Sequence, residues 1–254
     1  MNIYKTKEIA GIIGIHPNTV RLYEELGLIP RPERRSNGYR VFTDLHIEQF
    51  KLARTALKVE VLQNGLRKKA IGVIKLSAAG DFDGAIRLAE SYLQQIKEEQ
   101  RNAEEAITIT ERLLSDNKQE ADSSFFTRKE TANHLQISMD TLRNWEMNGL
   151  LVIKRKQNGY RVYTDKDIKL LKIIRSLRCA NYSLTAILRM LNALSGNPKV
   201  NIREVIDTPE GTDDIISVCD KLLTSLQYAE NSAHSMLVQL EKMKKRWPTA
   251  YIVS

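Results

Sequence analysis

The feature that most constrains this chain is an internal repeat. An offset of 122 residues places Ile15–Gly27 (IHPNTVRLYEELG) over Ile137–Gly149 (ISMDTLRNWEMNG). An offset of 121 residues places Asn37–Asp44 (NGYRVFTD) over Asn158–Asp165 (NGYRVYTD), where seven of the eight residues are identical. A match of this length at a nearly constant offset indicates a duplication. The fold must therefore accommodate one structural unit twice.

Each copy is expected to open with two short helices joined by a tight turn. In the first copy Lys7–Ile13 forms the first helix, and Gly14 takes the left-handed position after it. The second helix has His16 at its N-cap and Pro17 at its first position, and it ends at Gly27. This is a helix-turn-helix, whose second helix enters the major groove of DNA.

The second copy carries the same signals. Thr127-Arg128-Lys129-Glu130 is a capping-box pattern that starts the first helix. Ser138 stands at the N-cap of the second helix, Met139 follows it, and Gly149 ends the helix.

A β-hairpin wing is expected after each helix-turn-helix. In the first copy Asn37-Gly38 lies between β-prone segments, which is a strong hairpin signal. A third helix follows at Asp44–Leu57 in the first copy and at Asp165–Arg178 in the second. A fourth helix is expected around Leu62–Leu76 and at Ser183–Leu194.

A long helix with heptad spacing follows each module. The first seam consists of Ile86, Leu93, Gln100, Ile107 and Leu114 with Ala89, Ile96, Ala103 and Thr110. The second consists of Ile215, Leu222, Ala229, Met236 and Met243 with Cys219, Leu226, Ala233 and Leu240. This spacing predicts coiled-coil helices. The alternative is an amphipathic helix that lies on its own module.

The expected fold class is mainly α, with two winged helix-turn-helix modules, each carrying a small β-hairpin wing and followed by a long coiled-coil helix. The expected boundaries are module 1 at 1–76, its long helix at 77–114, a linker at 115–124, module 2 at 125–194, a loop at 195–212, the second long helix at 213–246 and a tail at 247–254. The loop at 195–212 has no counterpart in the first copy, so it is the first place to look for a ligand or partner.

The charge of the chain is concentrated in the two modules. The net charge is +8. Residues 1–76 hold 14 Lys and Arg against 7 Asp and Glu, and residues 123–194 hold 13 against 5. Residues 77–122 hold 5 against 11. Two basic blocks separated by an acidic one are typical of a protein that contacts a polyanion at two places.

The sequence gives no sign of catalysis, a cofactor or a membrane. No GxGxxG, P-loop or HExxH pattern is present, so the chain is expected to be no enzyme and to need no cofactor or metal. Cys179 and Cys219 are isolated, and both are expected to be small buried residues. Without a long apolar segment or a signal peptide, we expect a cytoplasmic, nucleoid-associated protein with no membrane partner.

Candidate DNA contacts gather in the second helix and the wing of each copy, because Arg reads guanine and Tyr, Thr and basic wing residues contact phosphate. In module 1 they are Asn18, Thr19, Arg21, Tyr23, Arg34, Arg35, Tyr39 and Arg40, with Arg67 and Lys68 in the fourth helix. In module 2 they are Asp140, Thr141, Arg143, Trp145, Arg155, Lys156, Tyr160 and Arg161.

These segments resemble a known family. NTVRLYEELGLI followed by RRSNGYRVFTD resembles the DNA-binding domain of the mercury-resistance regulator (MerR) family. DTLRNWEMNGLL with QNGYRVYTD is similar in the wing and less so in the second helix. The resemblance implies a winged helix-turn-helix, a second helical wing and a long helix that pairs antiparallel with a partner's. It also implies binding to double-stranded DNA at a promoter or operator, distortion of the DNA between promoter elements, and RNA polymerase as a further partner.

The chain departs from the family pattern in carrying two modules. Trp145 also stands where module 1 has Tyr23, so the modules are expected to read different half-sites. The first long helix lacks the cysteines of metal-sensing members, and no separate effector domain is expected. The hypothesis is a monomeric pseudo-dimer with an internal antiparallel coiled coil, and a homodimer is the alternative assembly. The alternative function is an architectural, chromosome-organising DNA-binding protein without a promoter role.

Overall fold

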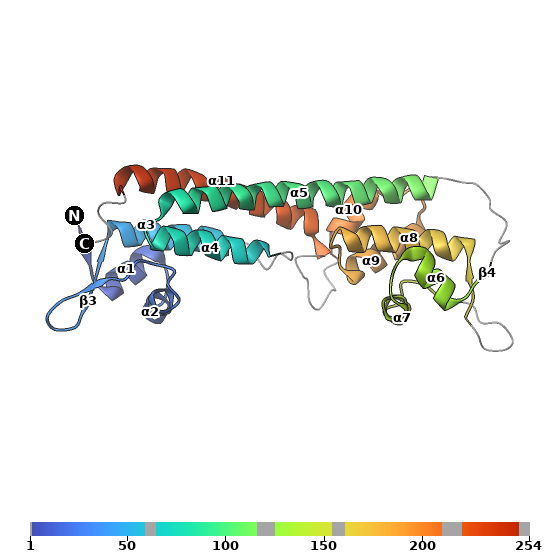
Figure 1. Cartoon of the computed structure of the whole chain (residues 1–254), viewed down its shortest axis with the longest axis horizontal. Coiled ribbons are helices and arrows are strands. Elements are labelled where there is room, and N and C mark those ends of the chain that lie inside the picture. Colours follow the sequence, from blue (N-terminus) through green and yellow to red (C-terminus); the bar gives the residue numbers. More distant parts are fainter. Residues whose placement is uncertain (1, 59–64, 116–124, 154–160, 210–219, 249–254) are drawn as a thin grey trace. The chain divides into compact units, whose positions relative to one another are not determined.

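The chain folds into two compact units, each of which holds one copy of the repeat. The computed structural model describes residues 2–58, 65–115, 125–153, 161–209 and 220–248 (Figure 1). Unit 1 consists of Met1–Glu98 with Ser225–Ser254, and unit 2 of Glu99–Thr224. Helix α5 (Phe82–Ser115) therefore contributes its first half to unit 1 and its second half to unit 2.

Unit 1 begins with the expected helix-turn-helix. Helix α1 (Thr6–Ile13) ends at Gly14, which has a φ of 71°. Helix α2 (Pro17–Glu25) is capped by His16, whose Nδ1 accepts from the backbone N–H of Asn18 at 3.2 Å. These caps satisfy helix-end groups that would otherwise lack a partner. They confirm the predicted end of α1 and start of α2, whereas α1 starts one residue earlier than predicted and α2 ends at Glu25 rather than Gly27.

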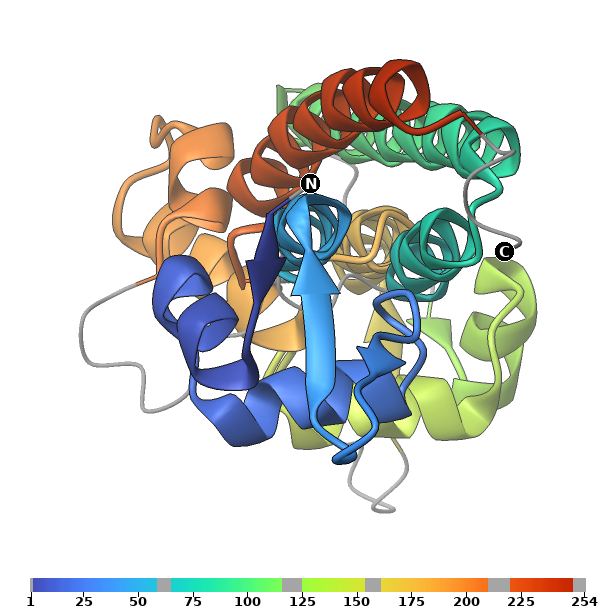
Figure 2. The same ribbon diagram turned by 90° about the vertical axis from the view of Figure 1, so that its left-hand side faces the viewer.

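A three-stranded antiparallel sheet follows, in the order β1-β3-β2 (Figure 2). Strands β2 (Glu33–Arg34) and β3 (Arg40–Thr43) form the predicted wing hairpin. The five residues between these strands include Gly38 at a φ of 81°, a left-handed conformation that favours glycine. Strand β1 (Ile3–Tyr4), which the sequence did not predict, pairs with β3.

Two further helices close the hydrophobic core of module 1. Helix α3 (Asp44–Leu57) has the predicted bounds, and α4 (Leu66–Ala78) begins a few residues later than expected. The core beneath them is apolar and fully buried, and its members are Ile9, Ala10, Val20, Ile29, Phe42, Ile47 and Phe50.

A buried amide ties these helices together. Gln49 of α3 is 0% exposed, and its Nε2 donates to the carbonyls of Leu28 at 3.1 Å and Ile74 at 2.9 Å. Its Oε1 accepts from the hydroxyl of Ser77 at 2.7 Å. A buried polar group destabilises the fold only when it lacks hydrogen-bond partners. Both polar atoms of this amide have partners, so it joins α3 to α4 and its burial is compensated by hydrogen bonds.

The two long helices run antiparallel within unit 1. Helix α11 (Leu222–Arg246) contributes Ser225–Arg246 to this unit. Lys97 of α5 pairs with Glu230 of α11 at 3.9 Å, and Asp83 pairs with Lys244 at 2.6 Å. Rising numbers along α5 thus meet falling numbers along α11, as the coiled-coil hypothesis expects.

Helix α11 also packs against module 1, although it follows module 2 in the sequence. Gln239 of α11 donates to the carbonyl of Glu48 in α3 at 2.9 Å, and Arg246 pairs with Asp44 at 3.4 Å. Helix α5 lies against α4 of its own module, where a Cβ on Gly72 would approach Leu88 to 2.9 Å. Both interpretations of the long helices, pairing and packing on a module, therefore hold in unit 1.

The heptad seams differ in how well they match burial. In α11 all described seam positions are buried: Leu222, Leu226, Ala229, Ala233, Met236, Leu240 and Met243. Ile215 and Cys219 lie outside the described residues. In α5, Ala89, Ile96, Ala103, Ile107 and Thr110 are buried, but Ile86, Leu93, Gln100 and Leu114 are only half-buried. Ala85, Tyr92 and Ala106 are buried instead, because a helix that faces both a module and a second helix buries a wider stripe than a simple seam.

Unit 2 repeats the helix-turn-helix. Helix α6 (Arg128–Leu135) starts with the predicted capping box, in which the N–H of Thr127 donates to Glu130 at 2.7 Å. Helix α7 (Met139–Met147) is capped by Ser138, which accepts from the N–H of Thr141 at 2.9 Å.

The remainder of module 2 follows module 1. Strands β4 (Phe125–Phe126) and β5 (Tyr163–Thr164) pair antiparallel, as β1 and β3 do in unit 1. Helices α8 (Asp165–Cys179) and α9 (Leu184–Gly196) match the predicted third and fourth helices within two residues. The tip of the second wing, 154–160, lies outside the described residues.

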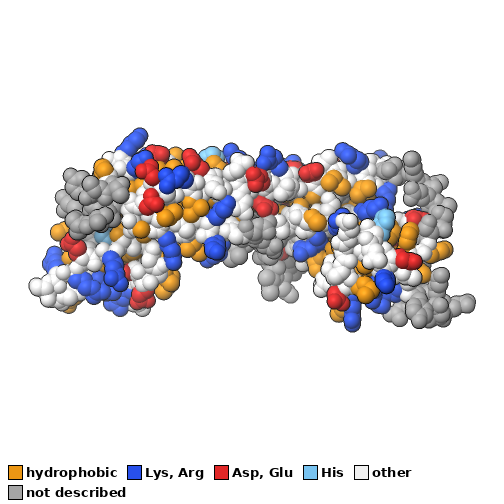
Figure 3. All heavy atoms as spheres, viewed as in Figure 1, with side chains coloured by type: hydrophobic (Ala, Val, Ile, Leu, Met, Phe, Trp, Pro, Cys, Tyr) orange, Lys and Arg blue, Asp and Glu red, His pale blue; other side chains and the backbone are white. Residues whose placement is uncertain are grey.

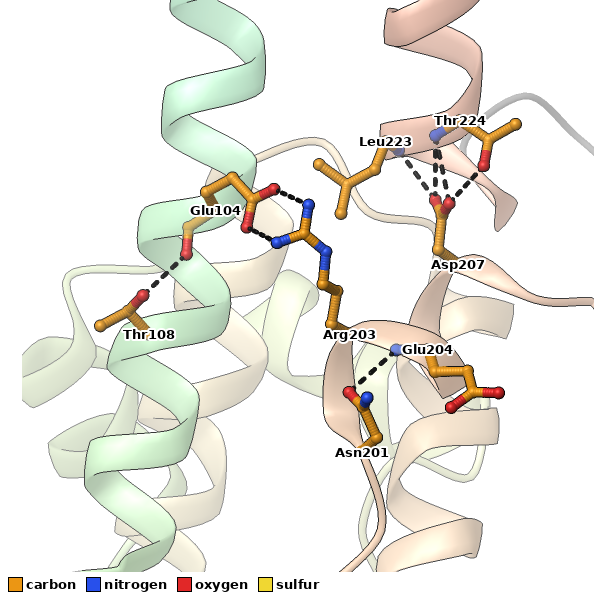
Figure 4. A network of polar contacts seen from close by, with 8 residues as sticks. All are labelled: Glu104, Thr108, Asn201, Arg203, Glu204, Asp207, Leu223 and Thr224. Carbon is orange, nitrogen blue, oxygen red and sulfur yellow. Dashed lines mark hydrogen bonds and ion pairs between the residues drawn. The ribbon is translucent and has the colours of Figure 1, made fainter.

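The loop expected at 195–212 contains a helix, α10 (Ile202–Asp207). Ile202 and Ile206 are buried, and the burial of these two apolar side chains stabilises this short helix. Arg203 forms a two-pronged ion pair with Glu104 of α5, at 2.9 and 2.5 Å (Figure 4). Asp207 accepts from the backbone N–H groups of Leu223 at 2.8 Å and Thr224 at 3.1 Å, and thus caps the start of α11.

The second half of α5 consequently packs against module 2. Besides the Arg203 pair, Asn181 donates to Glu99 of α5 at 3.1 Å. Each long helix therefore belongs partly to the unit built around the other copy's module. No described helix is long and apolar enough to cross a lipid bilayer.

A buried histidine makes the stability of unit 1 depend on pH. The side chain of His46 is 6% exposed, and its Nδ1 accepts from the backbone N–H of Thr43 at 3.0 Å. Burial lowers the pKa of His46 from 6.5 to about 4. Because the unfolded chain binds this proton more readily, the stabilisation is complete above pH 6.5 and is lost as the pH falls towards 4.

We predict that His46→Gln reduces this acid sensitivity. Glutamine keeps an acceptor at the capping-box position without titrating. The wild type should lose roughly 3 kcal/mol more than the variant between neutral pH and pH 4. Urea unfolding monitored by circular dichroism across this range measures the difference, and parallel curves would contradict it.

Candidate nucleic-acid interface

Helix α2 presents one polar face to solvent. Asn18, Arg21, Leu22 and Glu25 are exposed, and their spacing of three and four residues places them on the same side of the helix. The opposite side holds Val20, which is 0% exposed. Of the predicted contacts, Asn18 and Arg21 thus lie on the exposed face.

The other two predicted contacts of α2 lie nearer the core. Thr19 is half-buried, and the Tyr23 ring stacks on Phe50 with 5.4 Å between ring centroids. This packing holds α2 against Phe50 of α3 and leaves Tyr23 half-buried.

Helix α7 presents the corresponding face with different residues. Asp140, Arg143, Asn144 and Met147 are exposed. Trp145, which the sequence assigned to DNA, is only 4% exposed and lies in the core of module 2, so its role on DNA stays a prediction. The half-buried Thr141 shares a hydrogen bond of 2.8 Å with Ser138 at the helix N-cap.

Half of each exposed face was not among the predicted DNA contacts. Leu22 and Glu25 in α2, with Asn144 and Met147 in α7, occupy equivalent positions at the repeat offset of 122. Their helical spacing from Arg21 and Arg143 indicates that they share the exposed face. They were not predicted because only residue types that commonly contact DNA, mainly basic and aromatic ones, were selected.

A basic cleft of about 800 Å³ lies between the start of α1, helix α2 and the wing. It is lined by Lys5, Lys7, Arg21, Arg35 and Arg40, and its described lining includes no acidic residue. In Figure 3 the Lys and Arg side chains gather over this part of unit 1. Concentrated positive charge in a concave surface favours a phosphate backbone. Lys5 and Lys7 were not predicted.

A glutamate anchors the wing of module 1 to its recognition helix. The Nε of Arg40 pairs with Glu24 of α2 at 2.5 Å, and Arg34 pairs with the same carboxylate at 3.5 Å. The side chain of Arg40 is 22% exposed, whereas that of Arg34 is 53% exposed. Arg40 therefore holds the wing against α2 as well as facing the cleft.

Module 2 repeats this anchor with Glu146. Arg161 pairs with it at 3.1 Å, and Arg128 pairs with it at 2.5 Å. The buried hydroxyl of Tyr163 donates to the same carboxylate. Burial raises the pKa of Tyr163 to about 12, so this donor keeps its proton. Glutamate recurs at the same place in both copies, a signal in the sequence for this anchor that was not among the predictions.

The remaining predicted contacts are exposed or lie outside the described residues. Tyr39 on the wing is 71% exposed, and Arg35, Arg67 and Lys68 are exposed as well. Arg155, Lys156 and Tyr160 fall outside the described residues. Their roles on DNA stay predictions.

The cysteines offer no clustered ligand set in the part of the chain that the structure describes. There, no group of three or more His, Cys, Asp or Glu is placed to hold a metal ion. Cys179 is exposed, which corrects the expectation that it is buried, because it ends α8 on the side away from the core. Cys219 lies outside the described residues.

We predict that Arg40→Ala and Arg161→Ala each weaken DNA binding by on the order of 10-fold and lower the slope of log affinity against log salt by about one. Each substitution removes the ion pair that anchors the wing, and with it the phosphate contact that we predict for that arginine. Fluorescence anisotropy over a salt series measures both quantities. Weaker binding with an unchanged slope would mean that the arginine only anchors the wing, and unchanged binding in both variants would contradict the assignment.

Two family models match the chain. The model described as "MerR family regulatory protein" matches residues 5–42, and "MerR HTH family regulatory protein" matches residues 126–194. These matches fall on modules 1 and 2. No solved structure matches the chain.

Several bacterial regulators are similar to parts of the chain. The mercuric resistance operon regulatory protein of Bacillus cereus is 29% identical over 116 residues, which cover 46% of this chain and 83% of that protein. A probable heavy metal-dependent transcriptional regulator of Haemophilus influenzae is 31% identical over 118 residues, which cover 46% of this chain and 78% of that protein. The HTH-type transcriptional regulator CueR of Escherichia coli O157:H7 is 41% identical over 59 residues, 23% of this chain and 42% of that protein.

The two winged modules, the exposed recognition faces and these similarities lead to one conclusion. The chain belongs to the MerR family of DNA-binding transcriptional regulators.

Proposed function

We propose that the chain regulates transcription as a single-chain pseudo-dimer, which binds an imperfect inverted repeat in a promoter and distorts the DNA between the promoter elements. The observation that carries this proposal is the exchange of long helices between the two units. RNA polymerase at that promoter is the further partner, and the bacterial nucleoid is the place of action.

The helix exchange supplies what two chains would otherwise supply. Unit 1 combines module 1 with α11, and unit 2 combines module 2 with the second half of α5. The ion pairs Asp83–Lys244 and Arg203–Glu104 are contacts of this kind, one in each unit. A helix that pairs within its own chain has no need of a second copy.

Distortion of DNA requires each module to act as one stiff body. Bending a binding site costs on the order of 1–6 kcal/mol, which contacts to the backbone must offset. The ion pairs at Glu24 and Glu146 support this role, because they fix each wing to its recognition helix. A wing that moved freely would transmit no strain to the DNA.

We predict that the purified protein is a monomer of 29.1 kDa in solution. The physical reason is that each long helix buries its apolar stripe within one chain. Multi-angle light scattering over a dilution series measures the mass, and native mass spectrometry with operator DNA counts the chains per duplex. A dimer that persists on dilution, or two chains on one operator, would contradict the pseudo-dimer.

We further predict that the protein occupies promoters in cells. Genome-wide footprinting should place the bound sites between promoter elements, because distortion acts there. Binding spread away from promoters would instead favour the architectural role. A variant in which Arg21 and Arg143 are both alanine is the control, since both residues lie on the exposed recognition faces.

A further inference from the structure

The exposed faces of the two recognition helices share one residue and differ at the others. Arg21 and Arg143 occupy the shared position. At the three remaining positions the residues of α2 and α7 are, in order, Asn18 and Asp140, Leu22 and Asn144, and Glu25 and Met147. Chemistry thus changes at every exposed position except the arginine.

These differences correspond to different base preferences in the major groove. Arginine reads guanine with two hydrogen bonds, so the shared Arg21 and Arg143 favour a guanine in both half-sites. An apolar side chain such as Leu22 contacts the thymine methyl group, whereas an asparagine such as Asn144 pairs with adenine. Asn148 donates to the backbone carbonyl of Asn144 at 2.8 Å and, more distantly, to its Oδ1 at 3.4 Å.

The parts of the modules that hold the DNA backbone did not change in the same way. The wing arginines Arg40 and Arg161 occupy equivalent positions, and each pairs with the glutamate of its own recognition helix. Both helices also start at a capped N-terminus, at His16 and Ser138. The recognition helices are therefore presented alike and differ in what they read.

From this we infer that the protein binds its operator in one orientation only, with modules 1 and 2 on unlike half-sites, and that Leu22 and Asn144 are specificity-determining residues. The inference rests on the proposed function. A dimer of identical chains offers the same face twice, so this polarity requires two modules in one chain. The orientation of the operator then decides which of the two units faces the transcription start. Only unit 2 carries α10, among the described residues, so the two orientations would present different surfaces there.

Selection from a pool of random-sequence double-stranded DNA tests the inference. The wild type should enrich two half-sites that share a guanine, read by Arg21 and Arg143. The half-sites should differ at the neighbouring base, which Leu22 reads in one and Asn144 in the other. The double variant Leu22→Asn with Asn144→Leu should exchange the two bases concerned. Each single variant should make the half-sites more alike and lower affinity for the wild-type operator by on the order of 10-fold.

A matched control distinguishes a change in base preference from a loss of folding. Leu22 is 47% exposed, so its replacement should not unfold module 1, and circular dichroism checks this. Val238→Asn in α11, at a side chain that is 56% exposed, makes a similar change away from both recognition helices and should leave the motif unchanged. Two identical wild-type half-sites, or a motif that the double variant leaves unchanged, would overturn this inference alone. Failure to enrich any sequence would overturn the proposed function as well.

Discussion

The structure depends on how two long amphipathic helices cover their apolar stripes. Helix α5 has 34 residues and is about 51 Å long. A helix of this length with one buried stripe needs partners along all of it. In unit 1 its partners are α4 and α11, and in unit 2 they include α10 through Arg203 and module 2 through Asn181. The same requirement brings α11 onto α3 of module 1.

In each module, the residues that hold the wing in place differ from the residues on the exposed face of the recognition helix. Glu24 and Glu146 are nearly buried acceptors that hold the wing residues Arg40 and Arg161 against the recognition helices. The faces of α2 and α7 that carry Arg21 and Arg143 remain exposed. Because an ion pair formed within the module is already in place before DNA arrives, less ordering is required on binding. This arrangement allows the exposed faces to diverge without loosening the wing, and it is what makes an oriented DNA complex physically reasonable.

Much of the fold follows from local signals in the sequence. The starts of α2 and α7 follow from the caps at His16 and Ser138, and the wing follows from Asn37-Gly38. The site was predicted less completely. Trp145 was assigned to DNA because an aromatic side chain with an N–H group on a recognition helix can either contact DNA or pack in the core. Only the tertiary packing shows that it is buried. Lys5 and Lys7 join the basic cleft through the pairing of β1 with β3, a contact between distant residues.

The duplication, the family, the type of each module and the divergence of the recognition helices can all be inferred from the amino-acid sequence, because these features depend on residues close together in the chain. Tertiary structure decided which module each long helix packs against, because heptad spacing specifies a buried stripe but not its partner. It also decided that the segment after α9 folds into α10, since Arg203 and Asp207 acquire their role only beside Glu104 and the start of α11. Contacts between residues far apart in the chain carry that information, and local spacing does not.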